Sequence, residues 1–159
     1  MLYPNPSDNP YTSPVSRRVR AILLTDKQRL LFIKRVKPHK PRPYWVAPGG
    51  GVEDGDATLH DTLHRELCEE LGATVDILEH SFVLRHYKAD KRLEEHFFVC
   101  RLRSYDLSQR HGPEFDDPTR GLYIPDEIPL SARAIQEINI RTPELRDWLL
   151  ENLTRLSRL

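Results

Sequence analysis

The sequence contains little cysteine and no excess of either charge. Its two cysteines, Cys68 and Cys100, lie far apart, which excludes the close spacing of a zinc site or a disulfide framework. We therefore expect free thiols in a reducing cytoplasm. The 24 basic and 24 acidic residues give a formal net charge of zero, whereas general nucleic-acid-binding proteins usually carry a basic excess. We expect no general nucleic-acid binding, although balanced charge allows a local basic pocket for a small anion.

Long hydrophobic runs are also absent from the sequence. No apolar stretch approaches the roughly 20 residues that span a bilayer, and the first residues have neither the basic start nor the apolar stretch of a signal peptide. We therefore expect a cytoplasmic protein with no membrane span. The 159 residues, 38% hydrophobic and 30% charged, suit one globular domain. Residues 1–14 are rich in proline, serine and asparagine, so we expect them to form an extended tail before a single domain at 15–159.

Hydrophobic periodicity predicts a mixture of strands and helices. The expected strands are 16–23, 30–33, 75–87, 95–102 and 121–124. Turns are expected at 25–28 and 89–92, a proline-rich basic loop at 36–44 and a polar loop at 104–118. A last helix is expected from Thr142, as cap, to Leu156, with Pro143 at its first helical position. The predicted fold class is therefore α/β.

A glycine run followed by a helix forms the most informative segment. Gly49, Gly50 and Gly51 are consecutive, which indicates unusual backbone angles or close approach by a ligand. Phosphates are commonly bound by such loops and by helix N-termini. The helix is expected at 58–71, with Thr58 as its cap, three residues before Asp61, and Gly72 as its end.

Three glutamates lie on this predicted helix. Glu66 and Glu70 are four residues apart, so they project from the same face, where like charges repel. A hard divalent cation among the oxygens makes such a cluster favourable. Considered without their neighbours in the sequence, three glutamates on a helix are more often only a solvated acidic face. The glycine run directly before the helix favours a metal platform instead.

The segment from Gly50 to Ala73 resembles the box of the Nudix hydrolase family (MutT-like), Gly-x5-Glu-x7-Arg-Glu-U-x-Glu-Glu-x-Gly-U, where U is bulky and aliphatic. The matching core is Arg65-Glu66-Leu67-Cys68-Glu69-Glu70-Leu71-Gly72. Counting back from Arg65 puts the first glutamate of the box on Ala57. Counting forward from Gly50 puts it on Asp56, one residue further from Arg65 than usual. We prefer Asp56, because it keeps a carboxylate.

The resemblance implies a fold, a cofactor and a reaction. The fold would be an α/β/α sandwich with a mixed central sheet. Glu66, Glu69, Glu70 and the carbonyl of Gly50 would hold Mg²⁺ or Mn²⁺. The activated water would then attack a phosphorus of a nucleoside diphosphate linked to another group.

Further roles follow from the resemblance with less support from the motif. Arg65 would orient the carboxylates, with Asp56 as its partner, and Glu114 is a candidate second carboxylate near the metal. A surface position is an equally good interpretation of Glu114. Substrate contacts are expected from the basic loop and from the glycines. The predicted substrate-binding residues are Arg35, Arg42, Tyr44, Gly49, Gly50 and Gly51, although the basic loop also fits a merely solubilising role.

Two functions agree with these observations. The first is a metal-dependent nucleotide pyrophosphohydrolase acting on a small-molecule substrate. The second is a non-catalytic module of the same fold that senses a nucleotide or binds a protein, which the irregularity at Asp56 and Ala57 would favour. A homodimer is an expectation from the family resemblance alone.

Overall fold

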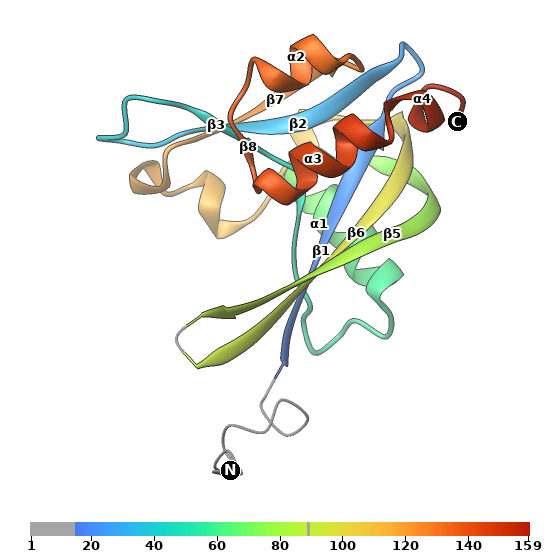
Figure 1. Ribbon diagram of the computed structural model, residues 1–159. Helices are drawn as coiled ribbons and strands as arrows, with labels where there is room; N and C mark the ends of the chain where they lie inside the picture. The colour runs from blue at the N-terminus through green and yellow to red at the C-terminus, as the bar shows by residue number, and fades with distance from the viewer. Residues whose placement is uncertain (1–14, 89) are drawn as a thin grey trace, which may run out of the picture.

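The computed structural model describes residues 15–88 and 90–159, which form one mixed sheet with helices on both faces (Figure 1). The strands are β1 Val15–Leu24, β2 Arg29–Val36, β3 Tyr44–Val46, β4 Gly49–Gly51, β5 Thr74–Lys88, β6 Lys91–Ser104, β7 Leu122–Pro129 and β8 Ile140–Arg141. The α-helices are α1 Leu59–Leu71, α2 Ala132–Gln136, α3 Pro143–Glu151 and α4 Leu153–Leu156. Within these residues, no helix is long and apolar enough to cross a membrane.

The sheet order explains how the glycines reach the centre of the molecule. The main path is β5-β6-β1-β2-β3-β8, with β7 paired to β2. β1 runs parallel to β6 along its whole length but pairs with β2 only at Leu23 and Leu24. Where β1 and β2 part, β4 pairs with β1 at 18–20 instead. The glycine strand is therefore held beside β1, inside the sheet.

Two hydrophobic cores lie on opposite faces of the sheet. On one face, Leu63, Leu67 and Leu71 of α1 pack with Val19 and Phe98, among other residues. On the other face, the core is built around α3 and the alternate strand residues, including Ile22, Phe97, Leu145 and Leu149. Figure 1 shows α1 behind the sheet and α3 in front of it. The predicted α/β/α arrangement with a mixed sheet is confirmed.

Helix α1 begins and ends where its caps predict. The Thr58 hydroxyl accepts a hydrogen bond from the Asp61 amide at 3.1 Å, which satisfies a donor that the first turn leaves free. Gly72 adopts a left-handed conformation, with φ of 56°, and its amide donates to the Cys68 carbonyl. A side chain at this position would be strained, so the glycine ends the helix.

Several predicted boundaries were wrong, because long-range pairing decided them. Gly49–Gly51 and Tyr44–Val46 form short strands rather than loop. The strand expected at 121–124 continues to Pro129, because it pairs with all of β2; its prolines are tolerated because β7 is an edge strand. β8 and α2 were not predicted at all.

Other corrections concern turns and helix ends. The last helix stops at Glu151, where the Asn152 side chain donates to the Trp148 carbonyl at 2.8 Å, and a separate α4 follows. The polar loop at 104–118 contains two 3₁₀ turns and the start of a third. β6 already begins at Lys91, which shortens the turn expected at 89–92; residue 89 and the predicted tail at 1–14 lie outside the described residues.

Candidate active site

The glycine strand and α1 are in direct contact. Gly49 has a φ of 150°, and a Cβ there would overlap the Val19 carbonyl. A Cβ at Gly50 would overlap the Glu66 carboxylate. The Gly49 amide donates to the Glu70 carboxylate at 3.3 Å. Gly50 is therefore needed because a side chain there would occupy the place of the Glu66 carboxylate, and Gly49 because of its backbone angle and the adjacent Val19 carbonyl.

Arg65 joins the glycine strand, the loop and the helix. Its guanidinium donates two hydrogen bonds to the Asp56 carboxylate, Nε to Oδ1 at 3.0 Å and Nη2 to Oδ2 at 2.8 Å. Nη2 also donates to the Gly51 carbonyl at 2.9 Å. On its other side, Nη1 lies 3.1 Å from Glu66 Oε1 and 3.3 Å from Glu69. This fork geometry is the one that arginine forms best.

Asp56 is therefore the carboxylate that pairs with Arg65. The Arg65 guanidinium, followed by the Glu53 backbone, holds the pKa of Asp56 well below its usual range. The Thr62 hydroxyl donates to the same carboxylate at 2.9 Å. The extra residue before the helix is thus accommodated in the loop, and the shorter aspartate still reaches the arginine.

The carboxylates of Glu66 and Glu70 are held in surroundings that disfavour their charge. Burial raises the pKa of Glu66 against the opposing effect of Arg65, and the negative charges of Glu69 and Glu114 raise it further. Glu70 keeps part of its surface exposed, but its carboxylate is enclosed. That burial raises the pKa of Glu70 to about 8, although Arg20 lies nearby. Both side chains are destabilised by their own charge.

The donor chemistry of this cluster fits a hard divalent cation. Glu66, Glu69, Glu70 and the backbone of Gly50 offer only oxygen ligands, the type that Mg²⁺ and Mn²⁺ prefer. In the arrangement described, Arg65 contacts Glu66 and Glu69, while Glu70 accepts from the Gly49 amide. Within residues 15–88 and 90–159, the structure contains no group of three acidic, histidine or cysteine side chains that are close enough together to coordinate one metal ion. Bringing them together around a cation would need side-chain rotation.

Glu114 lies near the same carboxylates. It belongs to a 3₁₀ turn at Pro113–Phe115, and its charge raises the pKa of both Glu66 and Glu70. The preceding loop is fixed to the end of α1. Arg110 donates to the Glu70 carbonyl at 2.7 Å, and the His111 amide donates to the Glu69 carbonyl at 2.9 Å. The sequence did not single out Arg110, because only the folded chain brings it to the helix.

The predicted substrate-binding residues are only partly brought together. A cavity of about 300 Å³ touches Glu70 and is lined by Arg35 and Tyr44, both nearly buried. Arg42 is exposed on the loop between β2 and β3 and does not line this cavity. The cavity is also lined by Arg18 and Arg20, which the prediction missed. Their alternate positions on the first strand were a visible signal that both face the same side.

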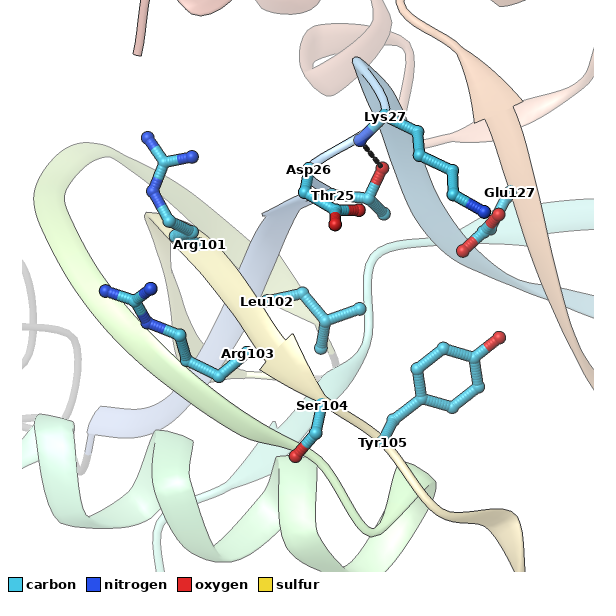
Figure 2. Close-up of a pocket in the computed structure, with 9 residues that line it drawn as sticks. All are labelled: Thr25, Asp26, Lys27, Arg101, Leu102, Arg103, Ser104, Tyr105 and Glu127. Carbon is cyan, nitrogen blue, oxygen red and sulfur yellow. Dashed lines mark hydrogen bonds between the residues drawn. The ribbon is translucent and has the colours of Figure 1, made fainter.

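A larger hollow lies elsewhere and contains none of the predicted site residues. Its volume is about 520 Å³, and it lies near the turn between β1 and β2 and the end of β6. Figure 2 shows Arg101 and Arg103 projecting away from Lys27 and Glu127, which face one another across from Tyr105. This hollow is lined by both basic and acidic side chains, which do not point to a common centre. Its larger volume therefore does not identify it as the active site.

The comparisons with known proteins identify the family. The sequence model of the NUDIX domain matches residues 15–142, and the chain belongs to this family. The RNA pyrophosphohydrolases of two strains of Histophilus somni, 2336 and 129Pt, are each 29% identical to it over 117 residues, covering 62% of this chain and 58% of the relative. The chain thus spans less than two thirds of these relatives.

Solved structures share the fold at low sequence identity. A NUDIX hydrolase from Nitrosomonas europaea has a TM-score of 0.65 and 19% identity, covering 89% of this chain and 90% of the other. The MutT protein from Methanosarcina mazei Go1 has a TM-score of 0.61 and 19% identity, covering 93% and 99%. A UDP-X diphosphatase has a TM-score of 0.62 and 15% identity, covering 92% and 67%. These likenesses confirm the predicted fold.

Proposed function

We propose that this protein is a pyrophosphohydrolase that uses Mg²⁺ or Mn²⁺ to cleave a phosphoanhydride bond of a nucleotide. The observation that carries the proposal is the fork of Arg65, which joins Asp56 and Gly51 on one side to Glu66 and Glu69 on the other. It fixes the acidic face of α1 against the glycine strand. A non-catalytic module would have little need for such repelling carboxylates.

Each residue has a proposed role in the reaction. Glu66 and Glu70 are the principal metal ligands, joined by Glu69 and the Gly50 carbonyl, and Arg65 with Asp56 positions them. When bound, the cation supplies neutralisation of charge on the phosphate oxygens. Glu114 accepts a proton from the attacking water. One bond forms between the water oxygen and phosphorus, and the bridging bond from phosphorus to oxygen breaks, so that the bridging oxygen leaves with the electron pair as part of the departing phosphate.

The reaction is tested with a panel of nucleotides. Nucleoside di- and triphosphates, nucleotide sugars, dinucleoside polyphosphates and an RNA with a 5′-triphosphate are each incubated with the protein and Mg²⁺ or Mn²⁺. The RNA is included because the relatives from Histophilus somni are RNA pyrophosphohydrolases. We expect metal-dependent release of phosphate, pyrophosphate or a nucleoside monophosphate from at least one. Tight binding without release from any of them would support the non-catalytic module instead.

The proposed setting is a cytoplasmic, single-domain enzyme acting on small nucleotides, with a homodimer as its expected assembly. Analytical ultracentrifugation of the full chain measures the assembly directly. A monomer at micromolar concentration would reject the homodimer without affecting the proposed reaction.

A further inference from the structure

A group of cationic side chains surrounds the cavity next to Glu70. This cavity adjoins a second one of about 370 Å³, because both are lined by Arg18, Arg20, Lys37, Tyr44 and Val46. The first also includes Arg35, and the second extends to Arg141. Five cationic residues therefore face a space that touches a proposed metal ligand.

Most of this positive charge has no acidic partner in the protein. Arg20 pairs with Glu95 at 3.1 Å. Within residues 15–88 and 90–159, by contrast, no carboxylate lies within ion-pair distance of Arg18, Lys37 or Arg141. Cations held close together without anions repel one another. The imbalance is local, because the whole chain is neutral, and it indicates an anionic ligand in this space.

Arg35 gives a second, independent indication. Its side chain is nearly buried, and its guanidinium lies 3.6 Å from the centre of the Tyr123 ring. One terminal nitrogen donates to the Arg120 carbonyl, but Nε has no hydrogen-bond partner in the described part of the chain. A buried charged donor without a partner is costly. An anion in the adjoining cavity would offset the charge of this guanidinium.

Tyr44 places two more cations beside the cavity. The Arg141 guanidinium lies 3.9 Å from the centre of the Tyr44 ring, and the Lys37 ammonium lies 5.6 Å from it. Contact with an aromatic ring stabilises a cation without neutralising its charge. The ring therefore positions Arg141 and Lys37 while leaving both able to bind an anion.

We propose that this cationic cavity makes the enzyme selective for nucleotides with at least three consecutive phosphates, with Lys37 and Arg141 holding the phosphates that are not attached directly to the nucleoside. The inference rests on the proposed pyrophosphohydrolase function and narrows its substrate class. A diphosphate linked to a neutral sugar would leave several of these cations unpaired, whereas a longer phosphate chain matches them. Arginine and lysine are the side chains that bind phosphate most strongly.

The test compares ATP with ADP-glucose, which share adenosine diphosphate and differ only in the attached group. With the full chain and Mg²⁺, we expect the higher kcat/KM for ATP. Combining Lys37→Met with Arg141→Gln should lower kcat/KM for ATP at least about tenfold, mainly through KM, and change that for ADP-glucose by less than about twofold. Lys37→Arg alone should retain most of the ATP activity, because it keeps the charge.

A binding measurement separates this inference from the proposed function. Isothermal titration of inorganic tripolyphosphate in EDTA should give a dissociation constant that rises about tenfold in the double variant. Arg101→Met, which removes a cation from the other hollow (Figure 2), should leave it unchanged. Preference for ADP-glucose, or equal tripolyphosphate binding by wild type and a folded double variant, would overturn the inference. Charge-dependent tripolyphosphate binding without hydrolysis of any nucleotide would support the cavity and reject the proposed reaction.

Discussion

The two sides of α1, a helix of thirteen residues, differ in the groups that surround their side chains. On the core side, Leu63, Leu67 and Leu71 are fully buried among apolar neighbours. On the side facing the glycine strand, the carboxylates of Glu66 and Glu70 are enclosed where burial raises the pKa of both. The core side stabilises the fold, whereas the acidic side opposes it. Buried carboxylates that lower the stability of the folded protein are therefore the candidates for a role in function.

The largest expected effect is on catalysis from the acidic side. Glu70→Gln should reduce turnover of the best nucleotide by about a hundredfold or more, because it removes a charged metal ligand worth several kcal/mol. Steady-state kinetics at saturating Mg²⁺ measures the change. Glu151→Gln, the same substitution at an exposed site on α3, is the control. Equal rates for wild type and Glu70→Gln would remove Glu70 from the metal site.

The core side should respond in the opposite way. Leu67→Ala should lower the free energy of unfolding by about 2–5 kcal/mol, because it leaves a cavity between α1 and the sheet. Urea unfolding followed by circular dichroism measures this loss. Leu122→Ala, at a side chain that is 58% exposed, should cost less than about 0.5 kcal/mol. A similar cost at both positions would contradict the proposed division between the two sides of α1.

The link between glycine strand and helix should have an intermediate effect. Asp56→Asn should lower kcat/KM about tenfold, because the neutral amide holds Arg65 less firmly while still offering one acceptor oxygen. The control is Asp54→Asn in the same loop, at an exposed position. If both variants retain full activity, the pair of Arg65 and Asp56 is not needed to position the carboxylates.

The smallest expected effect, counted per pH unit, is on the pH dependence of stability. The folded-state pKa of Glu70 is raised to about 8, so the protonated carboxyl favours the folded state. This contribution to the free energy of unfolding is complete below the unfolded pKa of Glu70 and is lost as pH rises through about 8. In EDTA, this group alone should lower wild-type stability by at most about 1.4 kcal/mol per pH unit within that window. Glu70→Gln removes this slope, so it should gain stability relative to wild type between pH 5 and pH 9 in urea unfolding. An unchanged difference across this range would show that the Glu70 carboxylate is solvated.

The sequence predicted the parts of the site that depend on short spacing. The four-residue step from Glu66 to Glu70 places both on one face of any α-helix, and Thr58 and Gly72 bound that helix through local hydrogen bonds. It also indicated Asp56 as the partner of Arg65, which the structure places in contact. Arg42, in contrast, lies away from the cavity although its loop neighbour Lys37 lines it. Sequence proximity alone does not determine which way a loop side chain faces.

The sequence by itself determined the acidic face of α1, the apolar stripe opposite it and the need for glycines beside it. It did so because helix spacing and capping depend only on local backbone geometry. Only the tertiary structure decided what surrounds that face. The parting of β1 and β2 admits β4 and brings Arg18 and Arg20 to the cavity. Arg110 fixes the loop that carries Glu114 near the glutamates. These placements depend on strand register and loop closure between residues distant in the chain, which no local spacing records.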